Sequence, residues 1–178
     1  GFVLGSAGHT TLTPGVYHFD SSAQLTGALT LDFQGNPNAD FIFQIGSTLT
    51  TADSSSVNVI NGNSLSGVYW QVGSSATLGT DTTFAGNILA LASVGLDPTA
   101  EILCGRAFAL TGAVTLKDNL ISNNNTAEDF DSGRSDFGSY GFSGGSAAPV
   151  VPEPSSMLLL GSGLAGLVAL NRKRFKKA

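Results

Sequence analysis

Apolar and polar residues alternate along most of residues 1–121, in short runs that are separated by turns. The pattern recurs after Gly67, Gly86 and Gly105, which are spaced 19 residues apart. Alternation with a period of two predicts half-buried strands, because successive side chains of a β-strand point to opposite sides. Gly, Asp, Asn and Pro divide each repeat into three such runs, so we expect three short strands per repeat.

One side of each predicted strand is apolar and is assigned to a shared core. For the first strand of the repeats the predicted inward residues are Val68, Trp70, Val72, Leu89, Leu91, Phe108 and Leu110. For the second and third strands they are Ala76, Leu78, Val94, Leu96, Val114, Leu116, Phe84, Ile102, and Leu120 or Ile121. Because an exposed apolar surface usually has a partner, we expect another element to cover the outer side of the first strand. The small apolar residues on that side are Ile88, Ala90, Ala107 and Ala109.

Two earlier segments match the repeats. Asp40–Val57 matches the segment that starts at Gly67 and places residues 43–45 over residues 70–72, and Leu25–Asp32 matches Leu110–Lys117. A period near 20 residues with three strands is typical of a parallel β-helix, in which coils stacked about 4.8 Å apart bury one continuous core. Long windows with apolar residues at i, i+3 and i+4 are absent from the repeats, so the predicted class is all-β.

The composition fits the all-β class and argues against some classes of function. Only 12 % of the residues are charged, and five of the eight basic residues stand in the last seven positions, so the repeats are acidic. An acidic body argues against binding nucleic acid, since phosphate contacts need a basic surface. The single cysteine, Cys104, excludes an intramolecular disulfide. It aligns with Ala85 and is expected to be a small buried residue.

No catalytic or metal-binding motif stands out in the sequence. His9 and His18 precede the regular repeats, and Arg106 and Lys117 are the basic residues within them, each alone. The Asp residues fall at turns, where they serve backbone geometry. The motifs GxSxG, the P-loop and HExxH are absent. We therefore expect no enzymatic activity, no metal and no cofactor.

The chain changes character twice after the repeats. Residues 122–150 are rich in Gly, Ser and Asn and predict a solvated linker. Residues 151–178 combine Pro152, Glu153 and Pro154 with an apolar run over about 155–170 and a basic end. The apolar run predicts a short transmembrane helix, and the positive-inside rule places the basic end in the cytoplasm. A plain tail anchor is one interpretation of this segment.

The same three parts, in this order at the end of the sequence, resemble the PEP-CTERM sorting signal of Gram-negative bacteria. The resemblance implies that an exosortase recognises Pro152, Glu153 and Pro154, that the C-terminal helix inserts transiently into the membrane, and that the tail is removed. The expected location is therefore secreted, or on the cell surface of a Gram-negative bacterium, by way of a transient C-terminal membrane anchor.

Outward threonines mark a candidate surface on the second strand of the repeats. We align two columns there: Thr30, Thr48, Thr77, Gly95 and Thr115, and beside them Asp32, Thr50, Gly79, Asp97 and Lys117. Spacings of about 4.8 Å between coils and about 6.6–7 Å along a strand are close to repeats of an ice surface. A rigid array of methyl and hydroxyl groups orders water through many weak contacts, although threonine also suits any solvated strand. The candidate ice-binding residues are Thr30, Thr48, Thr50, Thr77, Gly79, Gly95 and Thr115.

Four segments resemble the ice-binding (antifreeze) β-solenoid family of bacteria and fungi: "LTPGVYHF", "LTGALTLDFQGNPNADFIFQIGSTLTTADSSSV", "VYWQVGSSATLGTDTTFAGNILALASV" and "GRAFALTGAVTLKDN". The likeness runs over about residues 12–121. It implies a right-handed β-helix of triangular section with a long α-helix along one face, and an ice crystal surface as the partner. It also implies no cofactor and no catalysis. The N-terminal coils and the packing helix of the family are not found in this sequence, so we expect the chain to be part of a longer protein.

A second function remains open at this point. The same solenoid without ice activity would serve as an extracellular matrix or surface adhesin that binds exopolysaccharide. Aromatic residues on an outer face favour sugar, and Tyr69 is the one clear example in the repeats. The predicted domains are an ice-binding-like solenoid over 1–121, a linker over 122–150 and the sorting signal over 151–178.

Overall fold

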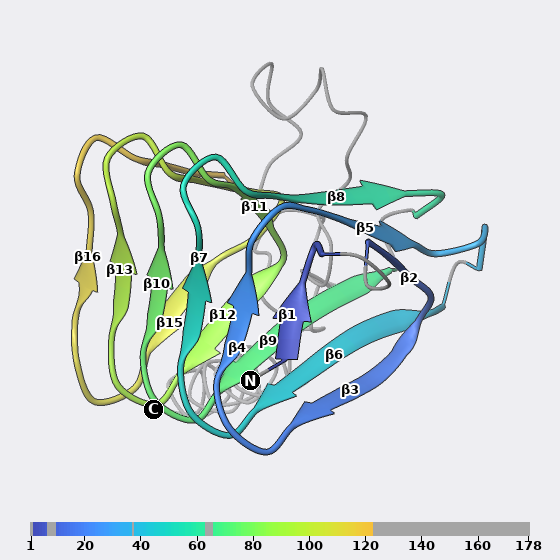
Figure 1. Ribbon diagram of the computed structural model, residues 1–178, viewed down its shortest axis with the longest axis horizontal. Coiled ribbons are helices and arrows are strands. Elements are labelled where there is room, and N and C mark those ends of the chain that lie inside the picture. The colour runs from blue at the N-terminus through green and yellow to red at the C-terminus, as the bar shows by residue number, and fades with distance from the viewer. Residues whose placement is uncertain (1, 7–9, 37, 63–65, 123–178) are drawn as a thin grey trace, which may run out of the picture. The chain divides into compact units, whose positions relative to one another are not determined.

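The computed structural model describes residues 2–6, 10–36, 38–62 and 66–122, which form three sheets of parallel strands (Figure 1). Sheet A has six strands: β1 (Phe2–Leu4), β4 (Ala23–Leu25), β7 (Leu49–Thr51), β10 (Ala76–Leu78), β13 (Val94–Leu96) and β16 (Val114–Thr115). Sheet B has six: β2 (Thr11–Leu12), β5 (Ala28–Asp32), β8 (Ser56–Ile60), β11 (Thr83–Ala85), β14 (Glu101–Leu103) and β17 (Leu120–Ser122). Sheet C has five: β3 (Gly15–Phe19), β6 (Asp40–Ile45), β9 (Gly67–Val72), β12 (Asn87–Ala90) and β15 (Ala107–Ala109).

The strands follow one another as the sides of successive coils. Each coil adds one strand to sheet A, then one to sheet B and one to sheet C, and pairs with the coils before and after it. In Figure 1 the strands β4, β7, β10, β13 and β16 run side by side along one wall of the solenoid. The predicted all-β class, a β-helix with three strands in each repeat, is therefore confirmed.

Much of the predicted stacking is confirmed in detail. Phe43 pairs with Trp70 and Ile45 with Val72, as the match between the two segments requires. In sheet A, Ala76, Val94 and Val114 lie in one row, and in sheet B Ile121 rather than Leu120 continues the row of Phe84 and Ile102.

The predicted register between β9 and β12 is wrong by one residue. Trp70 pairs with Ile88 rather than with Leu89, so the repeat is 18 residues long at this point instead of 19. A slip by one residue turns every side chain of a strand to the other side. Consequently Ile88 and Ala90 are buried, whereas Leu89 and Leu91 face outward.

The same inversion continues in the next coil, because Leu89 pairs with Phe108. Phe108 and Leu110 therefore point outward, and Ala107 and Ala109 pack against the core. The cause lies in the corner before β12. Gly86 adopts a left-handed φ of 98° there and lies so close to Val68 that a Cβ atom would come within 2.6 Å of its Cγ1. Gly86 therefore forms the corner itself and does not take the strand position equivalent to Gly67.

Cys104 is buried as predicted, but its predicted alignment is wrong. Leu103 pairs with Ala85, so that Cys104 takes the corner position that Gly86 holds one coil earlier. Its φ of 54° is left-handed as well. The next residue, Gly105, leaves no room for a side chain, since a Cβ atom there would lie 2.0 Å from the Gly86 carbonyl oxygen.

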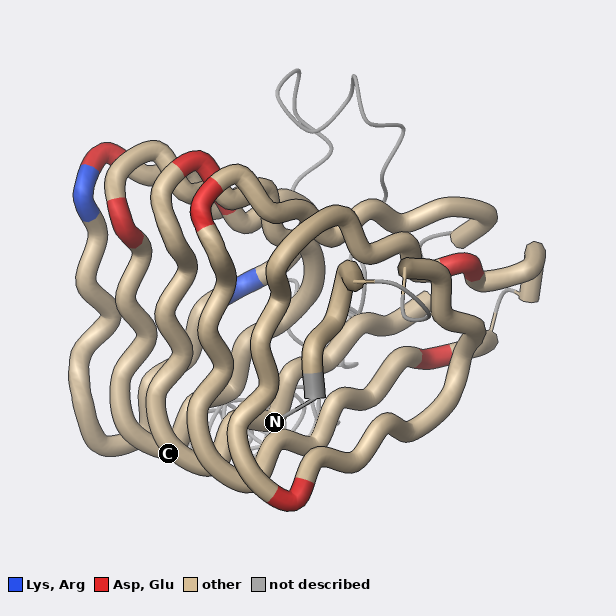
Figure 2. Tube along the Cα trace, viewed as in Figure 1, with Lys and Arg blue, Asp and Glu red and all other residues tan. Residues whose placement is uncertain are grey.

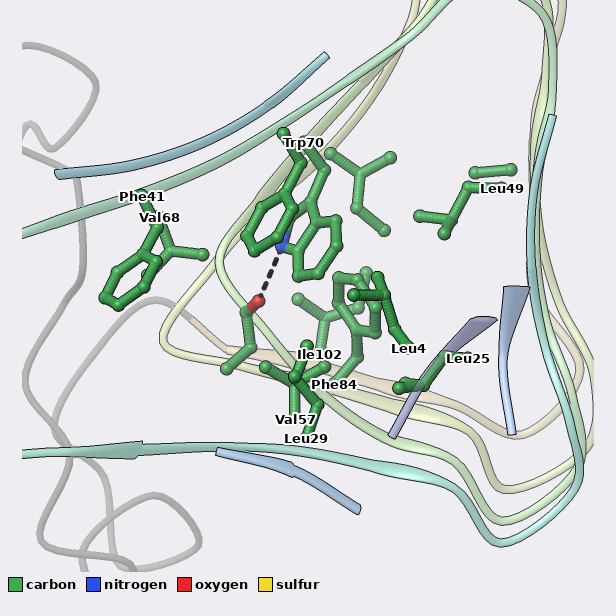
Figure 3. Packing of buried hydrophobic residues seen from close by; sticks show 14 of the residues in the cluster. Leu4, Leu25, Leu29, Phe41, Leu49, Val57, Val68, Trp70, Phe84 and Ile102 are labelled. Carbon is green, nitrogen blue, oxygen red and sulfur yellow. Dashed lines mark hydrogen bonds between the residues drawn. The ribbon is translucent and has the colours of Figure 1, made fainter. Parts of the chain in front are cut away.

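Stacked aromatic rings fill the core beneath sheet C. Tyr17 stacks on Phe43 at 5.3 Å between ring centroids, and Phe43 stacks on Trp70 at 3.8 Å. The indole Nε1 of Trp70 donates a hydrogen bond of 3.0 Å to the Ala85 carbonyl oxygen, drawn as the dashed line in Figure 3. The ring stacks link the coils of β3, β6 and β9, and the Trp70 bond ties β9 to β11 within one coil, so this part of the solenoid is held as a rigid body.

The corner between sheets A and B repeats one backbone feature from coil to coil. Ser54, Asp81, Thr99 and Asp118 all have a left-handed φ, between 55° and 62°. Backbone hydrogen bonds from Ser54 to Thr80 and from Asp81 to Pro98 stack these corners on one another. This turn recurs after the last four strands of sheet A, β7, β10, β13 and β16.

Several predicted features lie outside the described residues. They are His9, nearly all of the linker 122–150, the tail 151–178 with Pro152, Glu153 and Pro154, and the helix expected over about 155–170. Among the residues that are described, no helix is long and apolar enough to cross a membrane.

Candidate functional site

The outward side of sheet A carries one straight row of residues across its six strands. The pairing of these strands aligns Val3, Gln24, Thr50, Thr77, Gly95 and Thr115, which we call the Thr column. Neighbouring members lie about 4.8 Å apart, because that is the spacing of paired strands. Thr77 and Thr115 are exposed, and Thr50 is half-buried.

A second row runs beside the first, two residues earlier in each coil. It consists of Ser22, Thr48, Ser75, Ser93 and Ala113, which we call the Ser column. Backbone hydrogen bonds place its members level with one another: Ala23 donates to Thr48, Leu49 to Ser75, Ala76 to Ser93, and Val94 to Ala113. Sequence reasoning missed Ser22, Ser75 and Ser93. Alternation alone would have found them, since each stands two positions before a member of the Thr column.

The two columns differ in what their hydroxyl groups do. In the Ser column, the hydroxyls of Ser22 and Thr48 share a hydrogen bond of 2.8 Å, and the hydroxyl of Ser75 accepts one of 3.3 Å from the Ser93 amide. Within the described part of the chain, the hydroxyls of Thr50, Thr77 and Thr115 make no hydrogen bond to protein. The Thr column therefore leaves its hydroxyl groups to bond water.

The two columns carry no charged side chain. Charges gather instead at the corner with sheet B, as Figure 2 shows along the ends of the coils. There Lys117 Nζ lies 3.0 Å from Asp97 Oδ1; the Lys117 side chain is exposed and the Asp97 side chain is half-buried. The expected outward position of Asp97 and Lys117 is thus confirmed at the margin of the face. Uncharged methyl and hydroxyl groups make up its centre.

Three of the predicted site residues, Thr30, Thr48 and Gly79, do not belong to the Thr column. Thr30 lies in sheet B, between Thr11 and Asn58, and Thr48 belongs to the Ser column. The error at Thr30 came from matching "LTGALTLD" to "LTGAVTLK". In the first segment Leu25 ends a strand of sheet A and Ala28 begins one of sheet B, whereas Thr115 of the second segment lies in sheet A. Identical residues of the two segments therefore lie on different sides of the solenoid.

Asp32 also lies in sheet B, away from the predicted column. Its carboxylate accepts hydrogen bonds from Asn61 Nδ2 at 2.7 Å and from the Gln34 amide at 2.8 Å. These bonds, with that of Asn61 the larger, lower the pKa of Asp32 below its usual value. The residue serves a turn and is no part of the threonine face.

The two glycines of the predicted site differ in kind. Gly79 is buried at the corner, its amide donates to Thr51 Oγ1 at 2.8 Å, and a Cβ atom there would lie 2.7 Å from the Thr51 carbonyl oxygen. It is a turn residue and presents nothing outward. Gly95 sits within β13 in the Thr column, and a Cβ atom there would meet nothing within 4 Å.

Sheet C carries an apolar patch on its outer side. Leu89, Leu91, Phe108 and Leu110 are 37 %, 50 %, 40 % and 77 % exposed, and with Gln71 they line a hollow of about 510 Å³. The predicted apolar outer side of this strand exists, although it is built from residues that were expected to be inside. That another element covers it stays a prediction.

The aromatic residues of sheet C bear on the sugar-binding alternative. Phe108 faces outward in addition to Tyr69. Tyr69 is half-buried, and burial, with a smaller contribution from Asp40, raises the pKa of its hydroxyl against the opposing effect of Arg106. Arg106 also reaches Asn87 Oδ1 at 3.4 Å. Tyr69 therefore belongs to a cluster of mutually interacting side chains.

The described residues bring no three His, Cys, Asp or Glu side chains together in a group that could hold a metal ion. His18 is exposed on sheet C, with Nε2 at 3.2 Å from Asp20 Oδ1.

The fold and this face define a class of protein: a three-sided parallel β-solenoid with one flat, uncharged side of threonine and serine. The chain belongs to the ice-binding-like family, whose model matches residues 2–122. A second model, the PEP-CTERM protein-sorting motif, matches residues 150–174.

Known proteins support this assignment. An ice-binding protein of Nostoc sp. (strain HG1) is 53 % identical over 171 residues, which are 96 % of this chain and 57 % of that protein. The crystal structure of an ice-binding protein from an Antarctic biological consortium has 43 % identity and a TM-score of 0.61, and the match covers 67 % of this chain and 55 % of that one. For the ice-binding protein of the Antarctic ascomycete Antarctomyces psychrotrophicus the values are 40 %, 0.60, 65 % and 56 %. The chain thus spans little more than half the length of these relatives.

Proposed function

We propose that this chain binds ice through the outer side of sheet A and acts as an antifreeze-type protein that adsorbs to crystals and inhibits recrystallisation. The observation that carries the proposal is the alignment of the Thr column and the Ser column on one uncharged wall. Family membership and the ice-binding names of the relatives support it.

The physical argument rests on the difference between the two columns. The internal bonds of the Ser column hold Ser22 and Thr48 in place. The hydroxyls of Thr50 and Thr77 are left to bond ordered water, and their methyl groups lie beside them. A water-mediated contact is nearly as favourable as a direct hydrogen bond when the protein group is already fixed. Repetition over several coils adds such contacts without a further cost in ordering the protein.

Catalysis has no part in the proposal. The two columns contain neither a titratable residue nor a metal-ligating group, and the charged pair Asp97–Lys117 stands at the margin. We propose that the protein works by adsorption alone and needs no cofactor. An exopolysaccharide-binding role, the alternative, rests on Tyr69 and Phe108 of sheet C and receives no support from the relatives.

The test compares one substitution on each of two sheets in the full-length protein. Thr77→Tyr places a bulky ring in the Thr column, and Thr30→Tyr places the same ring on sheet B. We expect ice recrystallisation to be inhibited by the wild type and by Thr30→Tyr, and no longer by Thr77→Tyr, with unchanged circular dichroism. Loss of inhibition in Thr30→Tyr alone would place the ice-binding face on sheet B. Absence of inhibition by the wild type at micromolar concentration would refute ice binding.

For the tail we propose processing and export. The match of residues 150–174 to the sorting motif supports recognition of Pro152, Glu153 and Pro154 by an exosortase, after transient insertion of a helix over about 155–170 in a Gram-negative bacterium. The solenoid would then be released or held at the cell surface. In a host with an exosortase we expect Glu153→Ala to remain membrane-bound at full mass, whereas Asp131→Ala, in the linker, is cleaved normally. Normal cleavage of Glu153→Ala would contradict the proposal.

A further inference from the structure

Gly95 interrupts the Thr column at its centre. It pairs with Thr77 on one side and with Thr115 on the other, so both neighbours in the row are threonines. Unlike Gly5, Gly35 and Gly86, it has no left-handed φ. Its backbone is therefore an ordinary strand backbone, which any residue adopts.

Packing does not require a glycine at this position either. A Cβ atom on Gly46, Gly73 or Gly79 would lie within 2.5–2.7 Å of a backbone oxygen, whereas a Cβ atom on Gly95 would meet nothing within 4 Å. A glycine inside a strand normally weakens it, through chain entropy and the missing side chain. Neither backbone conformation nor packing therefore requires a glycine at position 95. The consequence of the missing side chain is a gap in the outer surface of sheet A.

We infer that Gly95 splits the ice-binding face into two separate parts and limits its affinity, so that a threonine at this position would join them. The inference rests on the proposed function of sheet A. At the Gly95 level the column lacks both the methyl group and the hydroxyl group that Thr77 and Thr115 provide. Two coil spacings, about 9.6 Å, therefore separate the threonines on either side.

The consequences differ for the two parts. Thr50 and Thr77 adjoin each other and stand beside the fixed hydroxyls of the Ser column. Thr115 stands alone beyond the gap, in the coil that also carries Ala113 and the exposed Lys117. Adsorption to a crystal depends on many weak contacts made at once, so an isolated threonine contributes less than one in a continuous row.

The experiment adds one side chain to each of two faces of the full-length protein. Gly95→Thr completes the Thr column. Ala28→Thr adds the same side chain to an outward strand position of sheet B and serves as the control for general effects of threonine on strand stability. Circular dichroism and thermal melting confirm that both variants fold. The readout is the lowest protein concentration that stops grain growth in an ice recrystallisation assay.

We expect Gly95→Thr to lower this concentration about threefold to fourfold, the effect of one additional buried methyl group, and Ala28→Thr to leave it unchanged. An active wild type with no gain in Gly95→Thr would overturn the role of Gly95 and leave ice binding intact. An equal gain in both variants would also overturn it, since the gain would then come from stability. An inactive wild type would refute the proposed function, and this inference with it.

Discussion

Thr50 and Thr51 are neighbours in β7, yet their side chains point to opposite sides of sheet A. Thr50 points outward in the Thr column and makes no hydrogen bond to the described protein. Thr51 is buried, bonds the hydroxyl of Thr82 at 2.9 Å and accepts a hydrogen bond of 2.8 Å from the Gly79 amide. The outer residue is available to a partner because the inner one fixes the corner at which the strand ends.

The first prediction separates these two roles. Thr51→Val leaves the buried Gly79 amide without its acceptor, whereas the Thr82 hydroxyl keeps the Ala52 carbonyl oxygen as a partner, and we expect a loss of about 2 kcal/mol in the free energy of unfolding. Thr50→Val has the same change in atoms but breaks no internal bond, and we expect an effect within about 0.5 kcal/mol. Urea unfolding of both variants measures the difference. Equal losses would mean that Thr51 does not hold the corner.

A second prediction concerns the left-handed corner. Thr99 is β-branched and has a φ of 62°, a conformation that costs such residues about 1–2 kcal/mol. Its hydroxyl bonds Asp81 at an exposed site, which offsets part of that cost. We expect Thr99→Gly to raise the free energy of unfolding slightly, by about 0.5 kcal/mol after the entropy cost of glycine.

The matched control is the same substitution in a strand. Thr83→Gly, in β11, removes a favoured strand residue and gains no relief, so that a loss of about 1 kcal/mol is expected. Thermal melting of the two variants should therefore shift in opposite directions. Shifts of the same sign and size would show that the corner at Thr99 is not strained.

The third prediction follows from the turn at Asp32. Asn61→Gly removes the amide that donates to the Asp32 carboxylate, and glycine tolerates the left-handed φ of 56° at this position. We expect the pKa of Asp32 to rise towards its ordinary value, because the largest cause of its depression is gone. An NMR titration of the Asp32 carboxyl carbon measures the change.

The sign of the stability effect is fixed by the same shift. A carboxyl group with a folded pKa below its unfolded value stabilises the fold above the unfolded pKa, and the contribution is lost as the pH falls through the folded pKa. In Asn61→Gly this acid-dependent part should shrink. An unchanged titration curve would show that the Gln34 amide alone holds the carboxylate.

The sequence pattern was sufficient where one side of a strand is polar. Ala76, Thr77 and Leu78 alternate cleanly, and for this reason the inward Ala76 and Leu78 and the outward Thr77 were predicted correctly. The prediction also holds for Val94 and Leu96, but it is wrong for Val114 and Leu116 of the last coil, which are 39 % and 52 % exposed. Trp70 was placed correctly over Phe43 because two long segments match without a gap. In both cases the number of residues between matching positions in the sequence equals the number between paired residues in the structure.

The pattern failed where the repeat length changes from coil to coil, and where both sides of a strand are apolar. Residues 88–92 read Ile-Leu-Ala-Leu-Ala, so alternation does not tell inside from outside, and the assumed repeat of 19 decided the matter wrongly. The register between β9 and β12 is set by the left-handed backbone of Gly86, and the sequence alone does not show that Gly86 adopts this conformation. Thr30 failed for a related reason, since a short matching motif straddles the corner between sheets A and B.

The last prediction tests this register directly. Ile88 is fully buried and Leu89 is 37 % exposed, although the 19-residue spacing assigns them the reverse positions. Ile88→Ala should create a cavity in the core and lower the free energy of unfolding by about 2–5 kcal/mol. Leu89→Ala shortens a side chain that is partly exposed to solvent, and it should lower the free energy of unfolding by less than about 1 kcal/mol. Guanidinium unfolding of the two variants distinguishes the registers, because a loss concentrated in Leu89→Ala would restore the 19-residue spacing and turn the apolar patch of sheet C inward.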